Sequence, residues 1–438
     1  MTRTSSTVDD DRSARPTPPP PAPELLGAWR ATGRADLVAH VDHFGPLPAP
    51  GPGDRHWGER FAAALDASGL TGRGGAAFPS ARKMALVRGR RPAPTVVVNA
   101  CEGEPASSKD AALLSCAPHL VLDGAELAAL ASGADRIVVC VGAERPDVAV
   151  AVDRAVAERV GSGHDPVPVA VERPPGRFVA GEESALVSWL GGGPAAPTFR
   201  PRRGEVLLLG RRPALVHNAE TLAHVALVAR LGPAAFRSTG LPEAPGTLLC
   251  TVSGAVTRPG VYEVAMGTPV LDVVGGAGPE EAVGAVLTGG FGGSWIGAGA
   301  LGAPYAPAPL ARVGGVVGAG VLVVLPRSGC GIAETARIAA FMAGESAGQC
   351  GPCVFGLPAL AGDLAALAQG RADRALPSRL ARRLEAVDGR GACRHPDGVV
   401  RMVRSALAVF AGDAGDHLRG APCPGHRRPS VLPRLRAG

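Results

Sequence analysis

A glycine-rich segment at residues 69–84 contains the residue types that hold an anion. Gly72, Gly74 and Gly75 allow backbone N–H groups to converge on a phosphate, and the helix that follows adds the positive end of its dipole. Lys83, on that helix, is one of only two lysines among 45 Lys and Arg residues, and a compact ammonium suits a position beside a phosphate. The pattern predicts a phosphate-binding loop, and the alternative is a plain turn.

A second polar segment, residues 99–110, directly follows an apolar run that is typical of a buried parallel strand. It contains the amide of Asn99, the carboxylates of Glu102 and Glu104, and the second lysine, Lys109. Ligands of open α/β sheets bind where strands end, so these groups are suited to hydrogen bonding with a polar ring or with ribose hydroxyls. An acidic surface turn is the alternative.

Two later segments, residues 181–186 and 217–222, each begin a predicted helix with polar side chains. Glu182 and Glu183 stand at the first helix start, and Asn218 and Thr221 stand at the second. Ordinary helix capping would account for either segment taken alone.

A Cys-x-x-Cys pair, Cys350 and Cys353, is followed by Cys393. Such a pair is compatible with a redox dithiol, half of a zinc site or part of an iron–sulfur site. A thioredoxin-like dithiol would follow a strand, whereas this pair lies between predicted helices, so the dithiol interpretation is disfavoured.

The elements that position these residues fall into three groups. Strands at 95–100 and 136–143 with a helix at 117–132 between them predict a βαβ unit. Residues 246–264 predict two strands with an Arg-Pro-Gly turn, followed by a helix start at Thr268, which together indicate a small β-grasp module. Beyond a strand at 318–326, four helical stretches predict a bundle, at residues 332–345, 357–370, 377–387 and 398–418.

Composition limits the function classes. The chain has 438 residues, enough for two to four domains, and 46% hydrophobic residues exclude disorder throughout. The net charge of +6 is spread over scattered arginines without stacking aromatics, so no nucleic-acid partner is expected. No apolar stretch of about 20 residues and no signal peptide is present, so we expect no membrane insertion and a cytoplasmic location, with peripheral attachment to a membrane complex left open.

Taken in order, these segments resemble the F-type, FMN- and NADH-binding subunit of respiratory complex I and the related subunits of NAD-linked formate dehydrogenases and hydrogenases. The matching motifs are GRGGAAFPSARK, NACEGEPASSKD, PHLVLDG, GEESAL, HNAETLA, VSGAVTRPGVYE and ESAGQCGPC, spread over about residues 69–412. The resemblance implies an α/β flavin-binding domain, an SLBB-like β-grasp domain and a C-terminal four-helix iron–sulfur bundle. The expected bounds are 53–240, 245–326 and 327–412, with a mostly disordered Pro-rich region at 1–52, in which one short helix near 25–40 is allowed, and a flexible tail at 413–438.

The resemblance also implies the site residues. FMN would be held by Gly72, Arg73, Gly74, Lys83, Asn99, Glu102, Gly181, Glu182, Glu183, Asn218 and Thr221. NADH or NADPH would meet Phe78, Glu104, Glu183 and Arg203, and an iron–sulfur cluster would use Cys350, Cys353 and Cys393. Hydride would pass from the nicotinamide to the flavin, and single electrons from the flavin to the cluster, with no catalytic protein nucleophile.

This chain departs from the family pattern at several positions. Cys101 replaces an Asp, His217 replaces an Asn, and Leu86 and Arg203 stand where aromatic rings are usual. Because an arginine can bind a 2′-phosphate, Arg203 favours NADPH or a lack of preference. Ala347 replaces the first cluster cysteine. That leaves three outcomes: a [4Fe–4S] cluster with a ligand from elsewhere, a three-iron cluster, or none. Outside ligands would be Ser346, Cys330, Cys423, His395, water or a partner.

Three functions follow from these patterns. The first is an FMN-dependent NAD(P)H dehydrogenase that passes electrons to an electron-transfer partner, such as other dehydrogenase subunits. The second is a flavoprotein relay with a decayed nicotinamide site, fed by a partner such as ferredoxin. The third is a non-enzymatic scaffold that binds partners through its β-grasp and helical parts.

Overall fold

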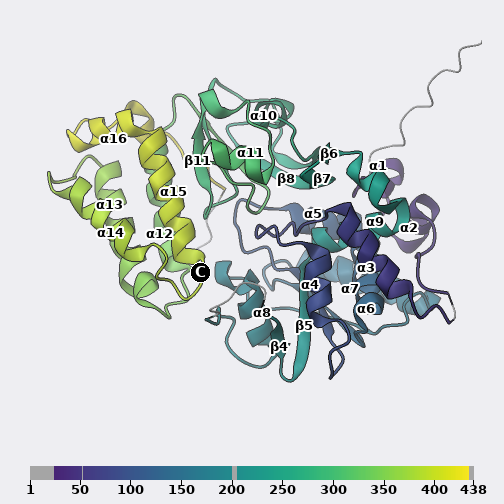
Figure 1. Ribbon diagram of the computed structural model, residues 1–438. Coiled ribbons are helices and arrows are strands. Elements are labelled where there is room, and N and C mark those ends of the chain that lie inside the picture. The colour runs from purple at the N-terminus through teal and green to yellow at the C-terminus, as the bar shows by residue number, and fades with distance from the viewer. Residues whose placement is uncertain (1–23, 52, 200–204, 434–438) are drawn as a thin grey trace, which may run out of the picture.

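The structure is a computed structural model that describes residues 24–51, 53–199 and 205–433. Figure 1 shows three parts: a sheet flanked by α3–α9 at the right, a second sheet with α10 and α11 in the upper centre, and helices α12–α16 at the left. This arrangement confirms the predicted fold class of an α/β domain, a β-grasp-like domain and a helical bundle.

The first sheet has five strands in the order β3-β2-β1-β5-β4. β1 (Thr95–Ala100) lies between β2 (Arg136–Val141) and β5 (Arg212–Asn218) and is parallel to both. The edges are β3 (Val169–Glu172), parallel to β2, and β4 (Leu207–Leu209), antiparallel to β5. The two predicted strands are therefore confirmed, and their apolar runs reflect burial on both faces.

Helices cover both faces of this sheet. One core contains residues of α3 (Trp57–Ser68), α4 (Ser80–Val87), α5 (Lys109–Cys116), α6 (Pro118–Ser132), α7 (Pro146–Ser162) and α9 (Ala219–Arg237). A smaller core lies under α8 (Glu183–Leu190) on the opposite face. α6 and α9 cross at Gly124, where a β-carbon would lie 1.8 Å from the carbonyl oxygen of Leu222.

The described residues 24–51 are more ordered than the prediction of a mostly disordered region at 1–52. The short helix allowed near 25–40 is present as two helices, α1 (Gly27–Thr32) and α2 (Leu37–Phe44). Leu25 is fully buried, and its N–H donates to the Glu263 carboxylate at 2.8 Å. Buried apolar residues such as Leu25 therefore order residues 24–51, although the average composition of this segment is typical of a linker. Residues 1–23 lie outside the described residues.

The second sheet has the order β11-β10-β12-β8-β9. The predicted strand pair is confirmed as β8 (Thr247–Gly254) and β9 (Gly260–Ala265), and the predicted helix as α10 (Val270–Ala277). β12 (Val321–Pro326) is parallel to β8. β10 (Val283–Thr288) lies between β12 and β11 (Ser294–Gly297) and is antiparallel to both. α10 and α11 (Pro307–Arg312) cover one face, and a small hairpin of β6 (Gly240–Leu241) and β7 (Ala244–Pro245) joins the two sheets.

The helical bundle covers the other face of the second sheet. Its helices are α12 (Gly331–Gly344), α13 (Leu357–Ala368), α14 (Leu376–Val387), α15 (His395–Val409) and α16 (Ala411–Leu418). They share one hydrophobic core with the inner strands, in which Trp295 of β11 contacts the ring of Phe410 edge-on at 5.3 Å. The expected fourth helix is therefore two helices that meet at Phe410.

The prediction of a flexible tail at 413–438 is wrong for residues 413–433. α16 continues to Leu418, His417 is fully buried, and Leu432 packs against the bundle core. The composition of this segment is mostly polar, so the sequence did not indicate that His417 and Leu432 would anchor it. Residues 434–438 lie outside the described residues.

Among the residues described, no single helix combines the length and apolar character needed to cross a membrane. The bent pair α5 and α6 meets that test only when the two helices are taken together, and they meet at an angle of 95°.

Candidate functional site

The glycine-rich loop between α3 and α4 is held at both ends. Thr71 and Pro79 form an isolated β-bridge, and the Gly72 N–H donates to the Phe78 carbonyl at 2.9 Å. The Arg73 N–H donates to Thr221 Oγ1 at 2.9 Å, which ties the loop to the first turn of α9. The loop is thus fixed before any ligand arrives.

The tip of this loop is open. Gly74 and Gly75 are exposed, and among the described residues their N–H groups make no backbone hydrogen bond. Gly75 has φ +97°, a conformation that favours glycine, and its β-carbon would lie 3.3 Å from the Gly318 carbonyl oxygen. A β-carbon on Gly74 would lie 3.3 Å from Asn218. The loop therefore offers unpaired amides at close approach to the sheet, as an anion requires.

Lys83 lies beside this loop on α4 and pairs with Glu183 at the start of α8. Behind it, His217 at the end of β5 is buried, and its Nε2 atom has no hydrogen-bond partner among the described residues. Burial lowers the pKa of His217 to about 3, and the charge of Lys83 acts in the same direction. A cation, a neutral imidazole and an unpartnered buried nitrogen fit a polar ligand at this position.

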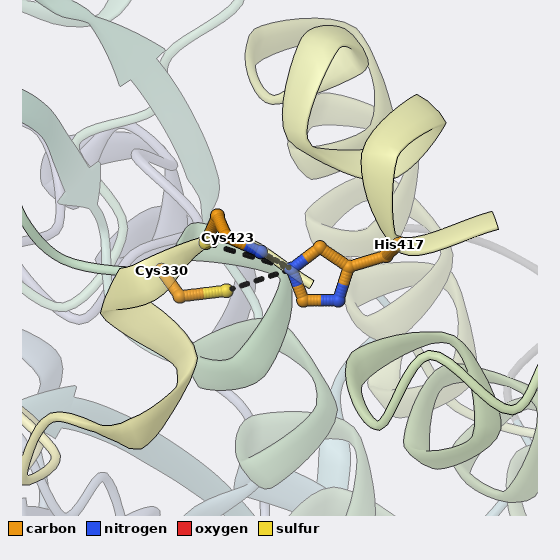
Figure 2. Close-up of side chains that lie close together, drawn as sticks. All are labelled: Cys330, His417 and Cys423. Atoms are coloured by element: carbon orange, nitrogen blue, oxygen red, sulfur yellow. Dashed lines mark hydrogen bonds between the residues drawn. The ribbon is translucent and has the colours of Figure 1, made fainter. Parts of the chain in front are cut away.

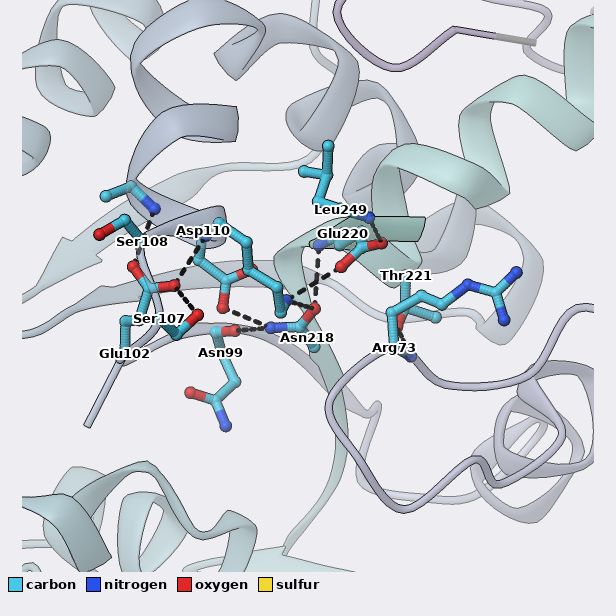
Figure 3. Close-up of polar contacts among 12 residues, drawn as sticks. Arg73, Asn99, Glu102, Ser107, Ser108, Asp110, Asn218, Glu220, Thr221 and Leu249 are labelled. Carbon is cyan, nitrogen blue, oxygen red and sulfur yellow. Dashed lines mark hydrogen bonds and ion pairs between the residues drawn. The ribbon is translucent and has the colours of Figure 1, made fainter. Parts of the chain in front are cut away.

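A buried ionic network lies under the site, where β1 and β5 end (Figure 3). The Lys109 ammonium contacts three oxygens: Asp110 Oδ1 at 2.7 Å, Asn218 Oδ1 at 3.1 Å and Glu220 Oε2 at 3.0 Å. Its three N–H donors thus have three acceptors. Burial works against the Lys109 charge, but Asp110 and Glu220 outweigh it and raise the pKa, so the ammonium remains charged.

This network fixes Asn218 and joins two domains. The Asn218 side-chain amide donates to the Asn99 carbonyl at 3.2 Å and to Asp110 Oδ2 at 2.7 Å, while its oxygen caps α9 by accepting from the Glu220 N–H at 3.1 Å. Glu220 also accepts from the N–H of Leu249 in β8 at 2.7 Å. The candidate site is therefore held against the second sheet.

Three of the predicted acidic site residues are engaged by backbone amides. Glu102 accepts from the N–H groups of Asp110 and Ala111 and so caps α5. Glu182 caps α8 by accepting from the Ser184 and Ala185 N–H groups. Glu104 accepts from Ala106 at 3.2 Å and from Phe291 of the second domain at 2.8 Å, and its burial raises its pKa to about 7.

The segment from residue 177 to residue 183 connects the glycine-loop site to the helical bundle. On one side, Asn99 donates to the Gly181 carbonyl at 2.9 Å. On the other side, the Phe178 N–H donates to Glu345 at 2.9 Å, and the Phe178 ring lies 5.3 Å from the ring of His395 on α15. One short segment thus contacts both candidate sites.

The three predicted cluster cysteines are gathered at this end of the bundle. Burial opposes the Cys350 thiolate, but the N–H groups of Ala392 and Cys353 donate to it and lower its pKa. Burial and the neighbouring Cys350 raise the pKa of Cys353 to about 12. Burial also raises the pKa of Cys393, and the charges of Glu182 and Cys350 add to this. Thiolates that accept backbone N–H bonds are suitable ligands for an iron–sulfur cluster.

The other residues considered in the sequence are placed as follows. Ala347 supplies no ligand atom, and His395 Nε2 is paired with the Met342 carbonyl at 2.8 Å. Cys330 and Cys423 lie together with His417 and not with Cys350. Phe78 is half-buried, with the Arg82 guanidinium 5.9 Å above its ring. Arg203 lies outside the described residues.

The three parts of the chain match known families. Residues 65–227 match the Nuo51 FMN-binding domain, residues 249–281 match the SLBB domain, and residues 333–417 match the NADH-ubiquinone oxidoreductase-F iron–sulfur binding region.

Similar full-length proteins agree with this assignment. An F-type subunit of the NADH-quinone oxidoreductase of Rhizobium meliloti is 32% identical over 374 residues, covering 82% of this chain and 89% of that protein. The HndC subunit of the NADP-reducing hydrogenase of Solidesulfovibrio fructosivorans is 28% identical over 82% of this chain and 76% of its own. A solved NAD+-reducing [NiFe]-hydrogenase in the H2-reduced state superposes with a TM-score of 0.77 at 32% identity, over 90% of this chain and 66% of that one.

The fold and the site thus define an oxidoreductase flavoprotein with FMN-binding and iron–sulfur binding regions. The chain belongs to the family of the F-type subunits of NADH-quinone oxidoreductase, which confirms the resemblance seen in its motifs.

Sequence reasoning missed the ionic network around Lys109. Its partners Asp110 and Glu220 are separated by more than a hundred residues, and only the fold brings them together. The scarcity of lysine in the sequence was a signal that could have found it. Lys109 is one of only two lysines, and it is the one that three acceptor oxygens contact.

Proposed function

We propose that this chain binds one FMN, oxidises NADH or NADPH, and passes the electrons to an iron–sulfur cluster at Cys350, Cys353 and Cys393. The observation that supports this most strongly is the segment 177–183. It hydrogen-bonds to Asn99 of the glycine-loop site and to Glu345 beside the cysteine site. A relay between two redox groups needs such adjacency.

The residues around the glycine loop divide into two roles in this proposal. Gly74 and Lys83 receive the FMN phosphate, while Gly72, whose N–H donates to the Phe78 carbonyl, shapes the loop. Asn99, Gly181 and Glu183 line the flavin. Arg73, Glu102, Glu182, Asn218 and Thr221 act mainly by positioning, because their polar groups hold the loop and the helix starts. Bound FMN supplies hydride acceptance and one-electron release, which the protein side chains do not provide.

The nucleotide would enter over the exposed loop. Phe78 offers a ring for stacking, and Glu183 lies beside Lys83 at the same opening. Glu104, buried against Phe291, acts by fixing the two domains to each other. Arg203 remains our candidate for the 2′-phosphate of NADPH.

For the cluster, three thiolates leave one iron without a cysteine, because Ala347 has no donor atom. We propose a [4Fe–4S] cluster with a labile fourth iron, or its three-iron form. Ala347→Cys should then raise the iron content and stabilise the four-iron form in EPR spectra.

We also propose that the chain works as a cytoplasmic subunit of a larger electron-transfer complex, with domains at 53–240, 245–326 and 327–412. Relatives named as subunits of NADH-quinone oxidoreductase and of a hydrogenase support a subunit role. We propose further that the chain is attached peripherally to a membrane complex, or that it exchanges electrons with a ferredoxin.

An anaerobic absorbance titration tests the proposed activity. The purified chain is reconstituted with FMN and mixed with increasing NADH or NADPH while the flavin band is recorded. Bleaching by either nucleotide supports the proposal. Bleaching only by dithionite or by a reduced protein partner would contradict nucleotide oxidation and favour the relay function. Protein that cannot bind FMN would contradict both functions.

A further inference from the structure

A second group of metal-ligand side chains lies apart from the predicted cluster cysteines. Cys330 stands at the N-terminal end of α12, His417 is on α16, and Cys423 follows on the segment leading out of α16 (Figure 2). Their ligand atoms all lie within 4.8 Å of one another. We propose that Cys330, His417 and Cys423 bind a Zn²⁺ ion that fastens the C-terminal segment to the bundle.

The geometry agrees with a tetrahedral zinc site. His417 Nε2 lies 3.5 Å from Cys330 Sγ and 3.5 Å from Cys423 Sγ. Zn–S bonds of about 2.3 Å and Zn–N bonds of about 2.0–2.1 Å in a tetrahedron place nitrogen and sulfur about 3.5 Å apart. The three side chains therefore enclose a point where an ion fits with little rearrangement.

The histidine is held in the form that a metal requires. Its Nδ1 atom lies 3.1 Å from the carbonyl oxygen of Leu367, which accepts only if Nδ1 carries the proton. Nε2 then presents a lone pair, as the N–H of Cys423 donating to it at 3.2 Å also shows. A ligating histidine whose other nitrogen donates to a backbone carbonyl is the usual arrangement at zinc sites. His417 is fully buried, so its orientation is fixed.

The donor set selects zinc among common ions. Two sulfurs and one imidazole disfavour Ca²⁺ and Mg²⁺, which take oxygen ligands. His426, whose ring lies 6.2 Å from that of His417, or a water molecule completes the fourth position.

The site is distinct from the cysteine site assigned to iron. Cys330 precedes the fourteen-residue helix α12, while Cys350 follows its other end. A helix rises about 1.5 Å per residue, so about 20 Å of helix separates the two positions.

The surroundings show what the ion would fasten. A β-carbon on Gly425 would lie 2.5 Å from the Ser328 carbonyl oxygen, so residues 423–425 lie directly on the turn before α12. Farther along, Ser430 donates to Glu334 of α12 at 2.6 Å. The ion would join the first turn of α12 to the end of α16. It would also hold the segment around Cys423, which follows α16, against both helices.

Zinc analysis of the full-length chain tests the proposal. Protein carrying FMN and iron is produced with zinc under reducing conditions and dialysed against a chelating resin. We expect about one tightly held zinc per chain by mass spectrometry of metals. Cys423→Ser should lose most of it, whereas Cys116→Ser, a half-buried cysteine on α5, should retain it. Cys350→Ser should also retain it, which separates this site from the iron site.

Cobalt provides an independent readout. Co²⁺ bound by two thiolates absorbs in the red, where oxidised flavin does not, and this band should appear in wild type and in Cys116→Ser but not in Cys423→Ser. If Cys423→Ser fails to fold, removal of the metal from wild type by a strong chelator should lower its Tm. It should also speed trypsin cleavage after Arg427, whose side chain is already exposed, because the backbone around it would no longer be held.

Several results would overturn the proposal. They are wild type without zinc after reconstitution, zinc that is lost with Cys350 instead of Cys423, and a disulfide between Cys330 and Cys423 in protein purified anaerobically. None of them bears on nucleotide oxidation by the flavin, which is measured separately.

Discussion

Replacing Lys109 by methionine should destabilise the protein far more than the same change at Lys83. Lys109 is 3% exposed and neutralises the buried carboxylates of Asp110 and Glu220. Removing one partner of a buried ion pair costs about 3–5 kcal/mol, because a charge is left uncompensated. For a domain of this size, about 2–4 °C of Tm is lost per kcal/mol, so Lys109→Met should lower the Tm by about 6–20 °C.

The pH dependence of this loss has a defined sign. Burial already raises the folded-state pKa of Glu220, and the Lys109 charge opposes this rise, so without the ammonium that pKa is raised further above its unfolded value. The Glu220 carboxyl is then tolerated at low pH as a neutral acid, and stability is lost as the pH rises through the raised pKa. The Tm difference between wild type and Lys109→Met should therefore be smaller at pH 5 than at pH 8.

Lys83→Met is the matched control. Lys83 is partly exposed and its ion pair with Glu183 is open to solvent, so its loss should cost less than about 1 kcal/mol of stability. It should instead weaken FMN binding about 10- to 150-fold, since a charge-assisted contact contributes about 1.5–3 kcal/mol. Thermal scans and flavin fluorescence titrations measure the two effects. Equal Tm losses in both variants, or wild-type flavin affinity in Lys83→Met, would refute this division of roles.

Three further predictions follow from the described contacts. Gly75→Ala should weaken flavin binding without unfolding the chain, because φ +97° and the nearby Gly318 carbonyl oppose a β-carbon in an exposed loop; equilibrium dialysis with FMN measures this. Gly124→Ala should force α6 and α9 apart and cost at least about 1–3 kcal/mol, visible in urea melts, and an unchanged midpoint would contradict the close crossing. Because burial raises the Glu104 pKa from 4.5 to about 7, stability present below pH 4.5 is lost as the pH rises through 7, by up to about 3 kcal/mol. In Glu104→Gln this part of the Tm–pH slope should disappear, and a persisting slope would point to other groups.

The sequence predicted the elements whose signals are local. The apolar runs at 95–100 and 136–143 and the helix at 117–132 are where the patterns placed them, since burial on both faces requires continuous apolar strands. The break at Phe410 was missed because helical spacing continues through it, no proline is near it, and the closest glycine, Gly412, lies inside the following helix.

Motif order predicted that segments far apart in the sequence meet at one site, while the roles of their residues could not be predicted. The structure brings Asn99 to Gly181 and Lys83 to Glu183, and their binding of a flavin stays a prediction. The capping function of Glu102 and the link from Glu104 to Phe291 depend on neighbours that only the folded chain supplies. Likewise, Cys330 and Cys423 are separated by more than ninety residues, so spacing alone could not join them to His417.

We propose that electrons from a nicotinamide reach iron at the three cysteines through the flavin. Anaerobic titration with the nucleotide that bleaches the flavin counts those electrons. A flavin accepts two electrons and an iron–sulfur cluster one, so wild type should consume about one and a half equivalents per chain and develop an EPR signal from reduced iron. Cys350→Ser should consume about one equivalent and give no such signal. Equal consumption by both proteins, with no iron signal in wild type that contains its full iron, would contradict the claim.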